Sequence, residues 1–134
     1  MALTADRNTK RRDGVLYSDP VAAATRLFAG SIVCLDASGN AVPGATATTL
    51  TARGVAQEQV DNRDGAAGDR RVESRRGVFP FANSASADEI TRADIGNSAY
   101  IVDDETVAKT DGTSTRSVAG VIRDVDDSGV WVEI

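Results

Sequence analysis

The chain is divided into short apolar, β-branched runs that alternate with clusters of turn-forming residues. SIVCLD at residues 31–36 is followed by ASGN, and SVAGVIRDV at residues 117–125 is followed by DDSG. Runs of this kind recur roughly every ten residues, which is typical of an all-β sandwich or barrel. We therefore predict a compact, mainly β domain over residues 21–134.

The size of the chain limits how large its core can be. Its 134 residues and 14.0 kDa predict one domain. Only three Phe, two Tyr and one Trp are present. The core must therefore consist of Val, Ile, Leu and Ala, or be completed by a neighbouring subunit.

The first twenty residues differ from the rest. MALTADRNTKRRDGVLYSDP shows neither a helical nor a strand period over its length, is polar and charged, and is closed by Pro20. We expect an extended arm over residues 1–20. Its basic side chains are Arg7, Lys10, Arg11 and Arg12.

These basic residues are candidates for contact with either nucleic acid or an acidic protein surface. The chain as a whole carries a net charge of −5, which argues against general DNA binding. We expect a protein partner and no direct contact with nucleic acid.

One helix is predicted. In SADEITRADIG, Ser86 is followed three residues later by Glu89, the spacing of a capping box. Gly96 stands where a helix commonly ends. Ile90 and Ile95 are expected to face the core.

Two further features concern glycines in strand-like runs. RVESRRGVFPF reads as one longer strand interrupted at Gly77, which indicates a bulge or a close backbone approach. RGVAQEQVD at residues 53–61 resembles AGVIRDVD at 119–126. This echo fits related strands in a pseudo-symmetric barrel and fits chance similarity equally well.

The sequence offers little for catalysis. The absence of histidine removes serine–histidine and cysteine–histidine nucleophilic sites and the usual zinc sites. The single Cys34 lies in an apolar run and reads as a buried, inert thiol that has no partner for an internal disulfide. The carboxylate clusters 103–105 and 126–127 flank turns, where solvent keeps such groups ionised. We expect no enzymatic activity and no cofactor.

The C-terminal stretch RDVDDSGVWVEI resembles the start of a calcium loop. Asp124, Asp126, Ser128 and Gly129 occupy the spacing of an EF-hand, but its twelfth position would be residue 135, and both flanks are β-branched. The prediction is a hairpin turn without a metal. Val130, Val132 and Ile134 would then share one face, with Trp131 on the other, covered by the helix or buried at an interface.

The N-terminal segment and the apolar runs bear on targeting. Residues 1–20 contain no apolar stretch typical of a secretory signal, and no run approaches about 18 apolar residues. We expect neither export nor a membrane partner.

Three phrases together are similar to a known family. They are GSIVCLDASGNAVPGATATTLTARGVAQEQVDN, RRGVFPFANSASADEITRADIGNSAYIVDDETVAK and AGVIRDVDDSGVWVEI. Over roughly residues 15–134 they resemble the small decoration, or cement, proteins of tailed bacteriophage heads. The order and spacing of the Gly-Val strand entries, Asp103–Asp104 and the final GVWVEI carry this resemblance.

The resemblance implies a β-rich domain of the kind called a β-tulip, assembled as a homotrimer at local threefold positions. Such proteins are made in the host cytoplasm and bind the outer capsid surface of the virion, bridging major capsid protein subunits and stabilising the expanded head. The basic arm would contact the capsid. The expected oligomer or core contacts are Val78, Phe79, Phe81, Tyr100 and Trp131.

Two other functions remain open at this point. One is a tail, baseplate or fibre module of a phage, with an exposed aromatic residue that binds glycans. The other is a hydrolase that uses Asp103, Asp104, Asp126 and Asp127. Labelling within virions separates the first from a head protein, and substitution of the four aspartates by asparagine tests the second.

Overall fold

The computed structural model describes residues 1–134 and is mainly β, as the sequence predicts. It contains twelve strands and two short 3-10 helices. The elements in chain order are β1 (Leu16–Pro20), β2 (Thr25–Leu27), β3 (Ile32–Leu35), β4 (Ala41–Pro43), β5 (Thr51–Ala56), β6 (Val60–Asn62), β7 (Arg71–Arg75), β8 (Val78–Asn83), η1 (Ser86–Asp88), η2 (Arg92–Asp94), β9 (Ser98–Ile101), β10 (Thr106–Ala108), β11 (Val118–Asp126) and β12 (Gly129–Glu133).

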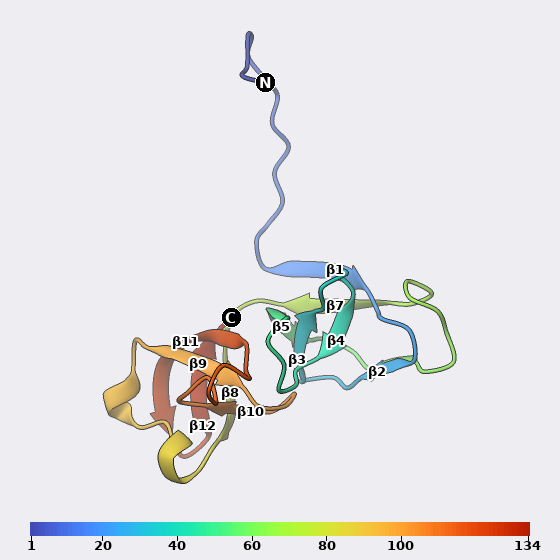
Figure 1. The fold of residues 1–134 in the computed structure, drawn as a ribbon. Helices are drawn as coiled ribbons and strands as arrows, with labels where there is room; N and C mark the ends of the chain where they lie inside the picture. The colour runs from blue at the N-terminus through green and yellow to red at the C-terminus, as the bar shows by residue number, and fades with distance from the viewer.

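The strands form three sheets. The first half of the chain makes a five-stranded sheet in the order β1-β7-β5-β3-β4, together with a two-stranded ribbon of β2 and β6. The second half makes a closed five-stranded barrel in the order β10-β8-β12-β11-β9. Sheet and barrel lie side by side, and the N-terminal arm projects away from both (Figure 1).

The five-stranded sheet is covered on both faces, and β3 shows why. Successive side chains of β3 point to opposite faces of the sheet, as strand geometry requires. Val33 belongs to a seven-residue core shared with the ribbon, which includes Leu27, Val60 and Val72. The neighbours Ile32 and Cys34 belong instead to the core of the barrel. A β-branched, apolar run without polar alternation therefore suits a strand buried on two sides.

The barrel has the larger core. Thirteen buried residues contribute, and Ile101, Val107, Ile122, Val130 and Val132 are all fully buried. Burying each such side chain stabilises the fold by about 1.5–3 kcal/mol. Because Ile32, Cys34 and Val55 of the first sheet join this core, sheet and barrel are packed as one body.

The C-terminal hairpin prediction is confirmed. β11 and β12 pair in an antiparallel register that brings Asp126 opposite Gly129. The carboxylate of Asp126 accepts a hydrogen bond from the Ser128 amide at 2.8 Å, which fixes the turn. Val130, Val132 and Ile134 are buried on the inner face, as the alternation predicts.

The helix predicted over residues 86–96 is wrong. Only the 3-10 turns η1 and η2 form there, separated by an extended segment. The side chain of Asn83 hydrogen-bonds to both backbone groups of Ile90. It accepts from the Ile90 N–H at 2.9 Å and donates to the Ile90 carbonyl at 2.8 Å. These groups are then unavailable for a helical ladder.

The capping box also lies elsewhere. It joins Thr91 and Asp94 in η2 rather than Ser86 and Glu89. Ile90 is buried as expected, but Ile95 is 37% exposed and does not reach the core. Because Asn83 holds the backbone of Ile90, only the Ile90 side chain of this segment points into the core, and Ile95 does not.

RVESRRGVFPF forms two strands rather than one interrupted strand. β7 belongs to the sheet and β8 to the barrel, and Arg76 and Gly77 carry the chain between them. Gly77 exchanges backbone hydrogen bonds with Ile134 at 3.3 and 2.9 Å, which closes this end of the barrel. The glycine marks a passage between sheets, not a bulge.

The arm is shorter than residues 1–20. Leu16–Pro20 forms β1, which pairs along its full length with β7. Tyr17 and Asp19 are held by Arg53, whose guanidinium lies 3.8 Å from the centre of the tyrosine ring and binds the aspartate through two hydrogen bonds. These distant contacts give the segment its strand conformation.

The similar segments 53–61 and 119–126 also share a structural feature at their glycines. A Cβ at Gly54 would lie 2.5 Å from the carbonyl oxygen of Arg75, and one at Gly120 would lie 2.0 Å from that of Glu133. Each glycine therefore sits where its strand passes close to the end of another strand. The register of β5 against β3 and that of β11 against β9 also shift at these positions.

Candidate functional site

Residues 1–13 form an exposed arm. Every one of them is exposed, and none takes part in a hydrogen bond or an ion pair. The first anchor is the carbonyl of Val15, which accepts a hydrogen bond from the Arg76 amide at 2.8 Å. The chain thus leaves the body at one defined point and extends into solvent (Figure 1).

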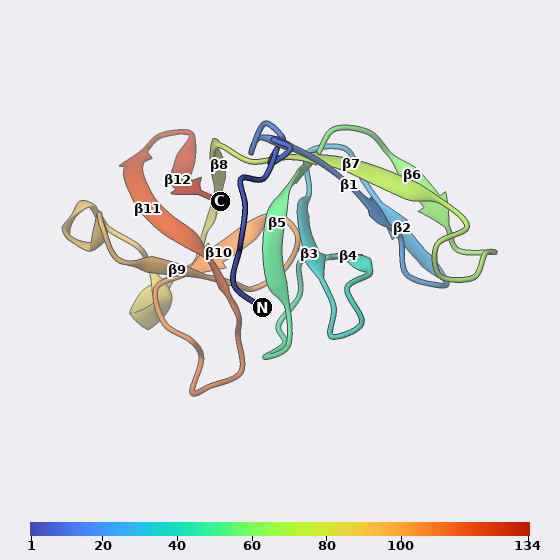
Figure 2. The same cartoon turned by 90° about the horizontal axis from the view of Figure 1, so that it is seen from above.

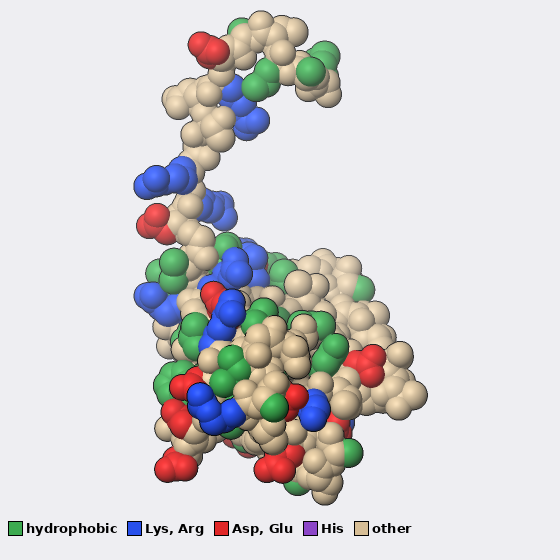
Figure 3. All heavy atoms as spheres, turned by 90° about the vertical axis from the view of Figure 1, so that its left-hand side faces the viewer, with side chains coloured by type: hydrophobic (Ala, Val, Ile, Leu, Met, Phe, Trp, Pro, Cys, Tyr) green, Lys and Arg blue, Asp and Glu red, His purple; other side chains and the backbone are tan.

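The predicted arm residues Arg7, Lys10, Arg11 and Arg12 all lie on this projecting segment. The body has the opposite charge, since residues 14–134 contain eighteen acidic and eleven basic residues. On the face shown in Figure 3, basic side chains follow the arm and most acidic ones lie on the body below it. The arm therefore presents concentrated positive charge away from a net negative domain.

The five predicted contact residues have different environments. Phe81 is buried in the barrel core, and Phe79 is half-buried against it. Tyr100 and Trp131 are half-buried, while Val78 is 45% exposed. Phe81 is thus a core residue, and Val78 is free to contact another molecule.

Trp131 lies on the outer face of the barrel. It is paired across the sheet with Pro80 on β8 and Asp124 on β11. Its indole N–H is enclosed without a hydrogen-bond acceptor. η2 lies against β11 beside this position, and Arg92 donates to the carboxylate of Asp124, the residue paired with Trp131, at 2.7 Å.

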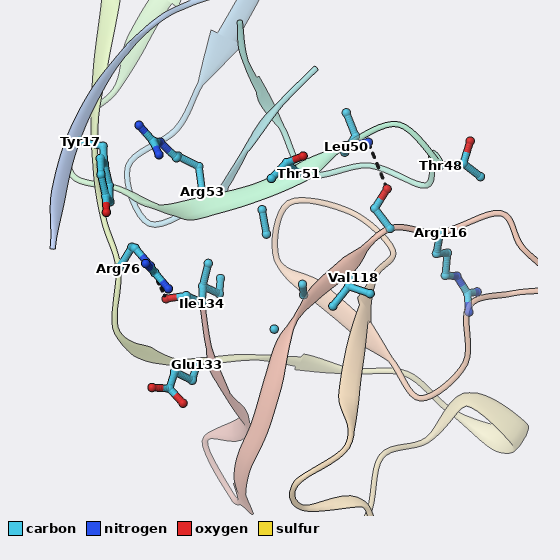
Figure 4. Close-up of a pocket in the computed structure, with 14 residues that line it drawn as sticks. Tyr17, Thr48, Leu50, Thr51, Arg53, Arg76, Arg116, Val118, Glu133 and Ile134 are labelled. Carbon is cyan, nitrogen blue, oxygen red and sulfur yellow. Dashed lines mark hydrogen bonds between the residues drawn. The ribbon is translucent and has the colours of Figure 1, made fainter. Parts of the chain in front are cut away.

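A groove runs between the sheet and the barrel at the base of the arm. One side is Thr51–Arg53 of β5. β3 pairs with this segment on one edge, but the opposite edge is unpaired because β7 pairs only with Val55 and Ala56. The other side is Val118–Gly120 of β11, which precedes the first residue paired with β12, Val121. The groove has a volume of about 740 Å³ and is bordered by two open strand edges (Figure 4).

The floor of the groove is apolar and its rim is polar. The floor is formed by residues at the edge of the barrel core, namely Ala52, Ala119 and Ile134. Their side chains do not fill the space above them. At the narrow end, the hydroxyl of Ser117 donates to the Ala47 carbonyl at 2.6 Å and accepts from the Leu50 amide at 3.1 Å. This pair of bonds ties sheet to barrel.

Three arginines line the rim. Arg53 is held by Asp19, and Arg116 lies 3.2 Å from Asp88, whose pKa is lowered by hydrogen bonds from Thr110 and Arg116. Arg76 has no carboxylate partner and donates only to the carbonyl of Ile134 at 3.4 Å. Arg76 is therefore the one rim arginine that forms no ion pair with an Asp or Glu side chain (Figure 4).

Sequence reasoning did not find this groove. Its two sides come from strands far apart in the chain, and neither carries a local signal of an unpaired edge. Tyr17, the residue that connects the groove to the arm, was assigned to the arm itself. Only the tertiary arrangement brings these parts together.

The carboxylate clusters serve as turn elements. Asp103 accepts a hydrogen bond from the Glu105 amide at 3.0 Å, and Asp126 accepts from Ser128. The pKa of Asp124 is lowered by the Val125 N–H and by Arg92. No group of three or more potential metal ligands gathers anywhere in the structure.

Cys34 is fully buried, as expected. Burial raises the pKa of its thiol to about 12, so the group stays protonated in the core.

Comparison with family models, curated proteins and solved structures finds no significant match for this chain. The structure contains no helix with the length and apolar character needed to cross a membrane. The arm and the groove at its base are therefore assigned from their geometry alone.

Proposed function

We propose that the protein is a structural component of a tailed-phage virion. In this proposal it binds the outer surface of the head, bridges major capsid protein subunits and stabilises the expanded shell. The observation that carries the proposal is the arm, whose four basic side chains have no partner within the chain. The resemblance of the ordered phrases to head decoration proteins supports the same function.

The physical properties of the arm suit a bridging role. Thirteen extended residues reach about 43–47 Å, enough to cross from one subunit to the next. Basic side chains favour an acidic capsid exterior, and contacts between exposed charges weaken as salt is added. Binding only to the assembled shell stabilises that state by mass action.

The charge distribution also gives the protein an orientation. With the arm toward the shell, the net negative body faces solvent and is kept away from an acidic capsid surface. Assembly as a trimer would place three arms on one local threefold position. The trimer belongs to the proposal and is not visible in a single chain.

The test is binding to purified, expanded, undecorated heads. The full chain is expected to reach stoichiometric occupancy that falls with increasing salt. Neutralising Arg7, Lys10, Arg11 and Arg12 with glutamine should reduce occupancy at least tenfold, whereas replacing only the three arginines with lysine should preserve most of it. Absence of saturable binding by the full chain contradicts the proposal.

Labelling the protein in intact virions separates a head protein from a tail, baseplate or fibre module. Label distributed over the head supports the proposal. Label confined to the tail would replace it with the glycan-binding alternative.

A further inference from the structure

The first six residues of the arm have a pattern of their own. Met1, Leu3 and Ala5 alternate with Ala2, Thr4 and Asp6, so an extended MALTAD has one apolar and one more polar face. Met1 and Leu3 are among the most exposed large apolar side chains of the whole chain, and Leu3 is 73% exposed. The tip is therefore a strand-forming segment without a surface to cover it.

The groove at the base of the arm has the complementary properties. Thr51–Arg53 and Val118–Gly120 offer unpaired strand edges, which can accept an added strand through main-chain hydrogen bonds. The floor of Ala52, Ala119 and Ile134 is apolar and has room for the larger side chains of Met1 and Leu3. The tip has apolar side chains and free main-chain groups, and the groove has an apolar floor and unpaired strand edges that could bind them.

Charge favours this pairing as well. Arg76 stands at the open end of the groove without a carboxylate partner, and Asp6 ends the apolar alternation of the tip. The basic residues of the arm follow Asp6 and would lie outside the groove. There they stay exposed and available to a further surface.

We propose that residues 1–6 of one copy insert as a strand into the groove of a second copy. The base of the arm is fixed by the Val15–Arg76 hydrogen bond, and from there the arm projects away from the sheet and the barrel (Figure 1). Seen from above, it crosses between β5 and β11 (Figure 2). Insertion into the same chain would require residues 7–13 to reverse direction within the length of the arm. Exchange between copies avoids this reversal, and repetition around a symmetry axis closes a ring.

A disulfide trap distinguishes exchange between copies from insertion within one chain. Leu3→Cys is combined with Ala52→Cys, while the buried Cys34 is left in place, and the purified protein is oxidised gently without heads. We expect covalent dimers and trimers on a non-reducing gel. Leu3→Cys with Ala82→Cys, which places the second thiol at an exposed site on β8, is the control and should stay largely monomeric.

A monomer with an internal disulfide, no cross-link, or equal cross-linking in the control would each overturn the proposal. Because no head is present, the outcome is independent of capsid binding. Failure here leaves the proposed function intact, and failure of head binding leaves this contact intact.

Two matched substitutions test which face of residues 1–6 lies against the groove. Leu3→Asp places a carboxylate on the apolar side of the tip, and Thr4→Asp places it on the opposite side. Sedimentation equilibrium should show self-association weakened about tenfold or more by Leu3→Asp and less than about twofold by Thr4→Asp. Equal effects, or a full chain that stays monomeric at every concentration, would exclude insertion through the apolar face.

Discussion

The barrel and the arm are opposite extremes of this molecule. In the barrel, thirteen residues pack into one core, and strands approach so closely that Gly120 has no space for a methyl group. In the arm, thirteen residues make no hydrogen bond or ion pair. The difference indicates that stability resides in the body. In the proposed function, attachment resides in the arm, so substitutions in the two regions should affect different measurements.

The largest loss of stability is expected from Gly120→Ala. The added Cβ would lie 2.0 Å from the carbonyl oxygen of Glu133, and that atom belongs to the backbone of β12 and cannot move alone. We expect the free energy of unfolding to fall by about 3 kcal/mol or more. Urea titration followed by tryptophan fluorescence measures it.

Gly14→Ala is the matched control, because its Cβ would meet only the Tyr17 hydroxyl at 3.8 Å. A change within about 0.5 kcal/mol is expected there. Equal losses at both positions would mean that the body is not packed as the structure describes.

A smaller loss is expected from Asn62→Ala. The Asn62 side chain is nearly fully buried and donates to the carbonyls of Ala22 and Ala66 at 3.0 Å each, which holds the loop after β6 against β2. Removing it breaks both hydrogen bonds and empties a buried position, which should cost about 2 kcal/mol. Thermal unfolding measures this, with Asn8→Ala in the arm as a control that should leave the melting temperature unchanged.

The contribution of Asp94 depends on pH. The Thr91 N–H, followed by Lys109, lowers the pKa of Asp94, although partial burial opposes this effect. A lowered pKa in the folded state means stability that is present above the ordinary aspartate value of about 3.9 and lost as pH falls through the lowered value. Wild type should therefore exceed Asp94→Asn in stability at neutral pH, and the gap should close on acidification below about pH 4.

Melting temperatures recorded across this pH range test the expectation. Asp13→Asn, in the arm, should match wild type throughout. A gap for Asp94→Asn that is constant with pH would show that the carboxylate charge is not what stabilises η2.

The smallest effect on stability is expected from removing residues 1–13. No hydrogen bond, ion pair or buried side chain is lost, so the free energy of unfolding should change by less than about 0.5 kcal/mol. Chemical denaturation at a concentration where the protein is monomeric measures it. A clear loss would show that the arm packs on its own body.

The sequence predicted those elements whose cause is local. The turn at Asp126–Gly129 follows from residues that favour a hairpin, and the inward face of β12 follows from the alternation of its β-branched run. These features need only the nearest neighbours in the chain. The same holds for the mainly β class.

The incorrect predictions have distant causes. SADEITRADIG has the composition of a helix, but Asn83, outside the segment, takes the backbone groups of Ile90. LYSDP lacks alternation, but pairing with β7 and contacts with Arg53 make it a strand. The passage at Gly77 is set by barrel closure, including the parallel pairing of β8 with β10, which no local pattern indicates.

For the candidate site, the sequence identified the arm and its basic residues but not the groove. Charge and lack of pattern are local properties, whereas an unpaired strand edge is defined by the strands that are missing beside it. The predicted contact residues differ in a way that the sequence alone does not reveal. Phe81 lies in the core, and Trp131 lies on the outer face of the barrel.

The most direct test of the division between arm and body is the occupancy of expanded, undecorated heads by residues 14–134 compared with the full chain. Both proteins should melt at the same temperature, and occupancy at equal concentration should fall at least tenfold without the arm. Equal occupancy by the two proteins would contradict the claim that the arm carries attachment.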